Sequence, residues 1–248
     1  MDTLQNKRID ELVDDNYIYA SVLYYFGIEF YHYSEQTLEQ VCQKKGLNIH
    51  AVVNQLEKQP SCDNQVEVAD FPIDLIIEYL KHSHYVFIKQ KLPFINNVIQ
   101  NLEIDTSEFQ LISKDLKFIF PLFVEDFIHH IYQEEDTLFN YIALLDQYKK
   151  GKGNVSRLYF EMEKHSLSRF ASEHEEHDDE MLGIRQITKE YEITDKTPLH
   201  LKVIYSELQS LEQELITHAR VENDILFPKA LILEKQVSNM LQAKVKYN

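Results

Sequence analysis

The sequence predicts an all-α protein, with an antiparallel four-helix bundle preceded by a small helical N-terminal domain. The 248 residues include only 5 glycines and 6 prolines, which leaves few turn formers for a many-stranded sheet. Hydrophobic residues make up 44% of the chain, enough for a substantial core. Four long stretches with helical periodicity follow one another with short connections, a pattern typical of an antiparallel bundle.

Residues 1–58 are expected to form the small N-terminal domain, and residues 59–71, which are polar, are expected to form a linker. The domain should contain three short helices, because each apolar stretch has a capping residue at its start or a glycine at its end. The predicted bounds are Ile9–Phe26 before Gly27, Ser34–Lys45 before Gly46, and Asn48–Lys58.

Residues 72–248 are expected to form the bundle and a C-terminal helix. Asp105 and Glu108 are spaced as a capping box, and the glycine-rich KKGKGN separates the second long helix from the third. The fourth helix follows Thr197 and Pro198, and Pro228 is expected to break it before the last helix. The approximate bounds predicted for the first three long helices are Pro72–Gln100, Thr106–Tyr148 and Val155–Tyr191.

Charge and cysteine content exclude several classes of protein. A net charge of −16 repels phosphates, so neither nucleic acid nor an anionic membrane is expected as the main partner. Two cysteines, Cys42 and Cys62, cannot form a disulfide scaffold or a cysteine-rich metal site. No basic start precedes an apolar run at the N-terminus, and no stretch is apolar enough to span a membrane. These features predict a soluble, cytoplasmic protein.

One ten-residue frame, H-x-x-x-E-x-D-x-L-F, occurs twice. It begins at His130 in HIYQEEDTLF and at His218 in HARVENDILF. Residues four apart share a helix face, so His130 can meet Glu134 and His218 can meet Glu222. Chance alone gives a histidine a carboxylate at this spacing about one time in six in so acidic a chain. The repetition of the whole frame, rather than the pairs, therefore indicates two equivalent environments.

Helical neighbours indicate which histidines point inward. His84 shares a face with apolar residues whereas His82 does not, and His130 is favoured over His129 on the same ground. On the third long helix His174 and His177 both have apolar neighbours, and the periodicity only slightly favours His174. With His218, this places one inward histidine on each of four helices.

Four imidazoles and two carboxylates that point inward are expected to bind metal ions rather than only to pack in the core. A charged glutamate on a buried face is costly unless a positive group meets it. Nitrogen and oxygen donors together suit iron, manganese or zinc. Six protein ligands can hold two ions, with the glutamates bridging them, and leave positions open to small molecules.

At these motifs the chain resembles the hemerythrin-like proteins, and more narrowly the di-iron proteins of iron–sulfur cluster repair. The likeness extends over residues 72–233 and includes YLKHSHYVFIKQKLP and SEHEEHDDEML besides the repeated frame. The resemblance implies two non-haem iron ions with oxo and carboxylate bridges, and its spacing favours His174 over His177. The ligands that it implies are His84, His130, Glu134, His174, His218 and Glu222.

The first 58 residues also resemble the domain that precedes the bundle in these repair proteins, but with a departure. The family places Cys-Cys-Gly-Gly after the position of Phe30, and here Tyr31, His32, Tyr33 and Ser34 follow. Thiol chemistry assigned to that pair is therefore not expected here, and we interpret Cys42 as a buried helix residue.

The resemblance implies a protein of the nitrosative and oxidative stress response that supports repair of damaged iron–sulfur clusters. Iron donation and the binding or reduction of nitric oxide or oxygen are both open as its chemistry, and nitric oxide reductase activity is therefore open too. Damaged iron–sulfur proteins would be its partners, and a homodimer is compatible with this interpretation. The alternatives are an oxygen or nitric oxide sensor that acts on a partner protein, and an iron reservoir.

Overall fold

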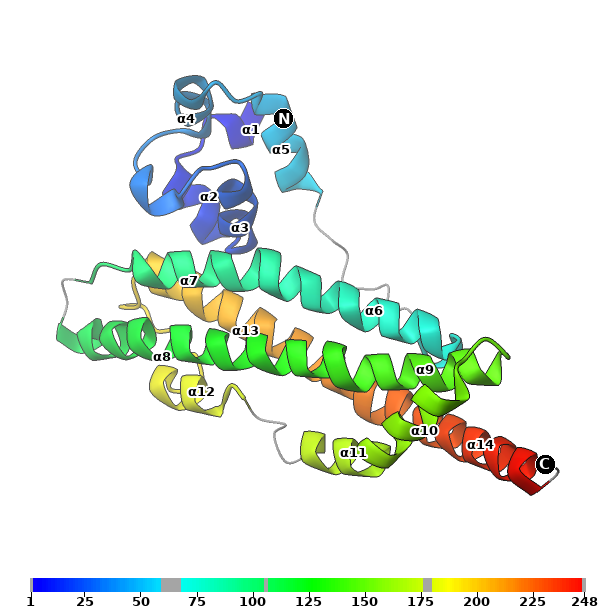
Figure 1. The fold of residues 1–248 in the computed structure, drawn as a ribbon. Coiled ribbons are helices and arrows are strands. Elements are labelled where there is room, and N and C mark those ends of the chain that lie inside the picture. Colours follow the sequence, from blue (N-terminus) through cyan, green and yellow to red (C-terminus); the bar gives the residue numbers. More distant parts are fainter. Residues whose placement is uncertain (1, 59–67, 105–106, 176–179, 247–248) are drawn as a thin grey trace. The chain divides into compact units, whose positions relative to one another are not determined.

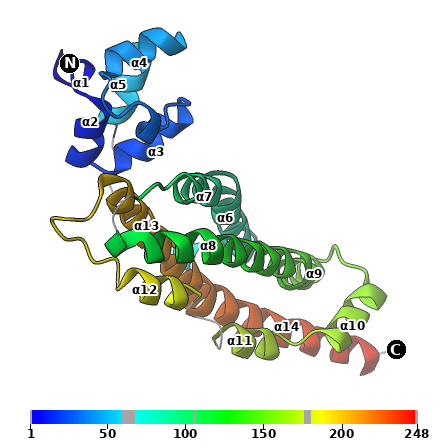
Figure 2. The ribbon, with the colours of Figure 1, turned by 90° about the vertical axis from the view of Figure 1, so that its left-hand side faces the viewer.

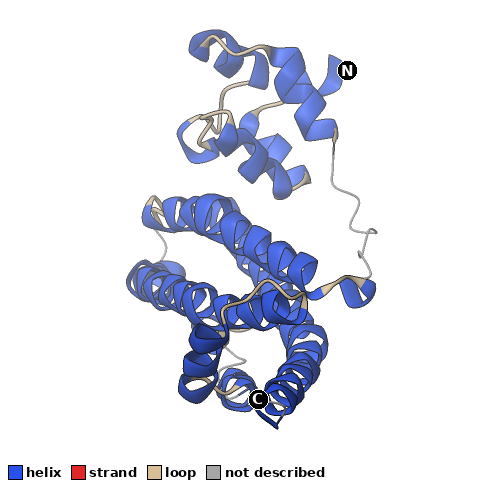
Figure 3. Ribbon diagram, turned by 45° about the vertical axis from the view of Figure 1, so that its right-hand side comes forward, coloured by secondary structure: helices blue, strands red, loops and turns tan. Residues whose placement is uncertain are grey.

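The computed structural model describes residues 2–58, 68–104, 107–175 and 180–246; the side chains of residues 2–3, 173–175 and 244–246 lie outside the description. Within these ranges the regular structure is helical and no strand occurs (Figure 3). Arg8 and Thr37 form an isolated antiparallel bridge. The all-α prediction is confirmed. None of the described helices is long and apolar enough to cross a membrane.

The described chain forms two compact units, to which the long helices α8 and α13 both contribute. The first unit comprises residues 1–65, 91–120 and 183–212. Its elements, in the order of Figure 1, are α1 (Asp2–Gln5), α2 (Ile9–Asp15), α3 (Ile18–Tyr25), η1 (Phe30–His32), α4 (Leu38–Lys45), α5 (Ile49–Glu57), α7 (Leu92–Gln100), the start of α8 (Ser107–Gln133), α12 (Leu182–Thr188) and the start of α13 (Leu199–Arg220).

The second unit comprises residues 66–90, 121–182 and 213–248. Besides the ends of α8 and α13 it contains η2 (Val68–Asp70), α6 (Ile73–Val86), η3 (Phe87–Lys91), η4 (Glu134–Phe139), α9 (Asn140–Lys149), α10 (Val155–Lys164), α11 (Leu167–Glu175), η5 (Val221–Leu226) and α14 (Phe227–Lys246). Helices α9 and α11 pack along α14 (Figures 1 and 2). The predicted domain bounds, 1–58 and 72–248 with a linker at 59–71, stay a prediction.

Local capping explains the short N-terminal helices. The Asn48 side chain accepts from the backbone N–H groups of His50 and Ala51, at 3.0 and 3.3 Å, and so starts α5 as expected. Helix α4 begins later than predicted, because Thr37 and Gln40 form its capping box.

The helix predicted over Ile9–Phe26 is divided into α2 and α3. Its chain turns out of the helix at Asn16, which is extended with φ −155°. The Asn16 side chain then accepts from the backbone N–H of Ile18 at 3.1 Å, where α3 starts. Asparagine favours this local bond over the helical one, which explains the break.

An aromatic cluster in the first unit lies where the resemblance would place the cysteine pair. The Tyr31 hydroxyl donates to Asn97 Oδ1 at 2.6 Å, and its ring stacks on that of His200, with centroids 4.8 Å apart and planes 7° apart. His200 Nε2 donates in turn to the carbonyl oxygen of Val98 at 2.9 Å. Tyr31 therefore ties η1 to α7 and α13 through packing and hydrogen bonding.

We expect His200 to make stability depend on pH. Burial lowers its pKa to about 4, from an ordinary value of 6.5. Between these pH values the unfolded chain binds a proton that the folded chain does not. The free energy of unfolding should therefore fall as pH falls from 6.5 towards 4, by about 2 kcal/mol after a discount for the partial exposure of the ring.

Urea unfolding of the wild type and of His200→Gln, at about pH 7 and about pH 4.5, measures this contribution. Glutamine can still donate to the Val98 carbonyl but does not titrate. The variant should lose about 2 kcal/mol less than the wild type on acidification. Equal losses in the two proteins would contradict the assignment to His200.

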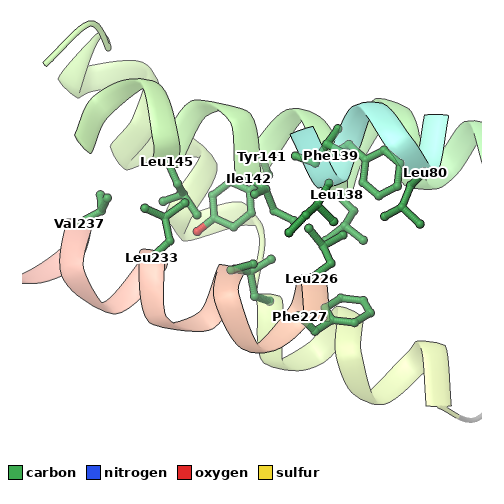
Figure 4. Close-up of a cluster of buried hydrophobic side chains, with 14 of the residues drawn as sticks. Leu80, Leu138, Phe139, Tyr141, Ile142, Leu145, Leu226, Phe227, Leu233 and Val237 are labelled. Carbon is green, nitrogen blue, oxygen red and sulfur yellow. The ribbon is translucent and has the colours of Figure 1, made fainter. Parts of the chain in front are cut away.

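The core of the second unit lies between α6, α9 and α14. Figure 4 shows the side chains of α9 and those of α14 meeting face to face, with Leu80 of α6 beside Phe139. Most of this core is fully buried, including Leu138, Ile142 and Leu226. At roughly 2 kcal/mol for each large apolar side chain removed from water, it is the main force that holds the candidate site together.

Three π-helical segments interrupt helices that the periodicity predicts as continuous. They are η3, η4 and η5, and the α-helices run on beyond each of them (Figure 1). Pro93 follows η3 and Pro228 follows η5, both within the first two residues of the next α-helix. A proline lacks the N–H that would be bonded there, and the first turn tolerates this loss. Pro228 therefore does not break the helix, contrary to the prediction.

The third long helix is shorter than predicted. Helix α10 ends at Lys164, because the next residue, His165, is extended with φ −118° and ψ 146°, and α11 starts after Ser166. The Ser166 hydroxyl accepts from the backbone N–H of Arg169 at 3.4 Å, a bond typical of a helix start. At the other end α12 stops at Thr188, and Tyr191 has a left-handed φ of 58°. The range predicted to be one helix over 155–191 is therefore broken.

Candidate metal centre

The repeated frame lies at two equivalent junctions of α-helix and π-helix. His130 is in the last turn of α8 and Glu134 is the first residue of η4. His218 is in the last turn of α13 and Glu222 is the second residue of η5. His84 occupies the last turn of α6, just before η3. Single π turns within α-helices occur frequently at functional sites.

These junctions bring four buried polar side chains to one point in the second unit. His84, Glu134, His218 and Glu222 each offer a ligand atom, and these atoms all lie within 4.8 Å of one another. Their exposed fractions are 1%, 6%, 9% and 1% in the same order. So compact a group of nitrogen and oxygen donors has the dimensions and the chemistry of a metal site.

The distances show how the four side chains converge. His84 Nε2 lies 3.0 Å from His218 Nε2 and 3.5 Å from Glu134 Oε2. His218 Nε2 lies 3.3 Å from Glu222 Oε1. The two imidazoles therefore aim the same type of nitrogen at the same place, with a carboxylate on either side.

His130 lies at the edge of this group. Its Nε2 is 3.2 Å from Glu134 Oε1, the other oxygen of the carboxylate that faces His84. Its side chain is 33% exposed. Glu134 thus has His84 at one oxygen and His130 at the other. His82 and His129, the neighbours that periodicity disfavours, are exposed.

Two histidines cannot be placed. The His174 side chain and all of His177 lie outside the described residues. Helix α11, which carries His174, packs on α14 in the same unit as the four buried side chains. His174 as the fourth histidine ligand stays a prediction.

Burial favours the neutral form of His84. Desolvation lowers its pKa below the ordinary value and the nearby His218 lowers it further, against the opposite effects of Glu134 and of the hydrogen bond that His84 donates to Glu135. A neutral imidazole is the form that binds a metal ion. Two buried glutamates beside a neutral His84 are costly, and a cation between them offsets that cost.

Tyr141 forms its hydrogen bond with α14, whereas Glu135 contacts one of the four buried side chains. The Tyr141 hydroxyl donates to Glu234 Oε1 at 2.5 Å, and Figure 4 shows that hydroxyl on the side of α14. Glu135, which the sequence did not single out, lies 2.8 Å from His84 Nδ1. The sequence feature that could have pointed to Glu135 is its position directly after Glu134.

A helical bundle with buried imidazoles and carboxylates at its centre defines a cation-binding protein of the all-α class. Residues 75–230 match the family described as "Hemerythrin HHE cation binding domain". The chain belongs to this family.

Proteins called "Iron-sulfur cluster repair protein YtfE" are similar to the chain over most of its length. They come from Escherichia coli O8 (strain IAI1), Escherichia coli O157:H7 and Shigella boydii serotype 18 (strain CDC 3083-94 / BS512). Each is 22% identical to it over 197 residues, which cover 79% of this chain and 84% of the relative.

Proposed function

We propose that the protein is a non-haem di-iron protein that supports the repair of damaged iron–sulfur clusters under nitrosative or oxidative stress. The observation that carries the proposal is the convergence of His84, Glu134, His218 and Glu222 within 4.8 Å. The family and the YtfE relatives support iron and cluster repair over other metals and tasks. We place its action in the cytoplasm.

The proposed ligands are the six residues of the sequence prediction. His84 and His218 face one position, between Glu134 and Glu222. His130, and His174 as predicted, would complete a second position, which Glu134 shares through its other oxygen. Two iron ions bridged by the two carboxylates and an oxo group would match this donor set.

Iron, when bound, supplies Lewis acidity and one-electron chemistry that the side chains lack. The contribution of this chain is to fix the donors and to limit the access of water. Three of the four central residues are at most 6% exposed, and apolar side chains of α6, α9 and α14 form the core of the same unit. His130, whose side chain is 33% exposed, gives the centre one side that small molecules such as nitric oxide or oxygen can approach.

The proposal is tested by repair of a 4Fe–4S enzyme that nitric oxide has inactivated. Iron-loaded protein should restore the activity of that enzyme, and the metal-free protein should not. The Glu222→Ala protein, loaded in parallel, is the matched control for the centre itself. Equal recovery with loaded, metal-free and variant protein would overturn the proposal.

A gas sensor is the second candidate, and the aromatic cluster at Tyr31 favours it. The hydroxyl and the ring of Tyr31 are engaged by Asn97 and His200, so this position contributes packing where the repair proteins have thiols. A sensor should bind nitric oxide reversibly and leave the damaged enzyme inactive, so the same assay separates the two. Loss of iron to a chelator without any effect on the enzyme would indicate a reservoir instead.

A further inference from the structure

We propose that Glu135 is a positioning residue that fixes the orientation of His84 for metal binding. The inference rests on the proposed metal centre and names a seventh side chain that the centre needs. Glu135 Oε1 lies 2.8 Å from His84 Nδ1, within normal hydrogen-bond range.

This hydrogen bond determines which nitrogen of His84 is available. A neutral imidazole has one N–H and one lone pair. Glutamate is only an acceptor when it is ionised, so the proton belongs on Nδ1 and the lone pair on Nε2. Nε2 is the atom that faces His218 and Glu134, at 3.0 and 3.5 Å. Glu135 therefore directs the free lone pair of His84 to the point where the other donors meet.

The π-helical segment η4 puts two successive carboxylates on one imidazole. Successive residues of an α-helix point about 100° apart and rarely reach the same ring. Here Glu134 approaches Nε2 and Glu135 approaches Nδ1 of His84. Phe139, the last residue of the same segment, stacks on the His84 ring with planes 7° apart and centroids 5.7 Å apart. One short segment thus fixes the edge and the face of the ring.

Burial distinguishes the task of Glu135 from that of a ligand. Its side chain is 31% exposed, whereas that of Glu134 is 7% exposed. A carboxylate that keeps contact with water can hold its charge at less cost than a third fully buried one. A charge-assisted hydrogen bond of this kind makes the imidazole a stronger donor to a metal. In the second copy of the frame the equivalent residue is Asn223, which carries no charge.

Metal binding by Glu135→Gln tests the proposal, with Co²⁺ as the probe because its visible spectrum reports coordination. Glutamine keeps the size of the side chain but removes the charge. We expect about a 10- to 100-fold rise in the Co²⁺ dissociation constant and a changed visible spectrum. Asp136→Asn is the matched control: it removes the same charge from the next, exposed residue and should shift the constant by less than about twofold.

A double-mutant cycle with His84→Ala shows whether Glu135 acts through His84. In the His84→Ala protein the added Glu135→Gln change should have no further effect on Co²⁺ affinity. An equal loss in both backgrounds, or no loss in the wild-type background, would overturn the role of Glu135 alone. If the wild-type protein binds neither Co²⁺ nor iron, the proposed metal centre fails and the role of Glu135 fails with it.

Discussion

Glu222→Ala is expected to reduce the iron bound per chain to a small fraction of the wild-type amount. Glu222 is 1% exposed, and its carboxylate lies 3.3 Å from His218 Nε2 at the meeting point of the buried donors. Alanine removes a proposed oxygen ligand and half of the negative charge that two buried glutamates supply. His130→Ala, which removes a proposed ligand of the second position, should also lower the iron content. We expect the affinity for iron to fall at least about tenfold in each case.

Iron analysis together with the optical spectrum measures this effect, since an oxo-bridged pair of ferric ions absorbs in the near ultraviolet. Asp224→Ala is the matched control, because Asp224 lies in the same segment, η5, and is exposed. Urea unfolding of the metal-free protein tests whether a variant has lost iron only because its fold is less stable. Because Glu222 is 1% exposed and lies close to a second buried glutamate, its replacement should leave the stability of that form equal or higher by about 1–3 kcal/mol. Full iron content in both Glu222→Ala and His130→Ala would refute the ligand assignment.

Phe139→Ala is expected to lower the free energy of unfolding by about 3–5 kcal/mol. Phe139 is 1% exposed and lies in the core of the second unit (Figure 4). Its ring stacks on that of His84. Its removal leaves a cavity that the rigid neighbours cannot close and also frees the His84 ring to turn. Metal affinity should therefore fall together with stability, which distinguishes Phe139 from core residues remote from the centre.

Urea unfolding of the metal-free protein measures the stability change, and Co²⁺ titration measures the change in affinity. Phe118→Ala removes the same side chain from a position that is 70% exposed, and it should change stability by less than about 0.5 kcal/mol. Phe139→Leu keeps most of the volume and should cost under about 1.5 kcal/mol. A loss below about 1 kcal/mol for Phe139→Ala would show that the pocket around His84 repacks easily.

The repeated frame allowed most of the candidate centre to be predicted, because spacing alone puts His130 with Glu134 and His218 with Glu222. The inward face of α6 likewise pointed to His84, through its apolar neighbours. Glu135 was missed for a physical reason. Regular helical periodicity points Glu135 about 100° away from Glu134, yet within η4 both carboxylates approach the ring of His84.

The helix bounds were less predictable, because local side-chain bonds compete with the helical ones. Asn16, Thr37 and Ser166 each use a side-chain oxygen to start a helix where the apolar pattern alone does not require one. Such residues occur throughout loops and helices, so their presence in a sequence does not decide which of them cap. The fold class was robust because it depends on the long apolar pattern rather than on any single cap.

The π turn at η4 also sets the rotation of the core residues that follow it relative to the proposed metal ligands. An α-helix advances about 100° per residue, so the loss of one residue within this turn would rotate everything after it by that angle. Tyr141, Leu145 and Tyr148, all buried on one side of α9, would be carried away from α14 while His130 stayed in place. A one-residue deletion there would yield a more regular helix, but the side chains before and after the deletion would no longer face the same core.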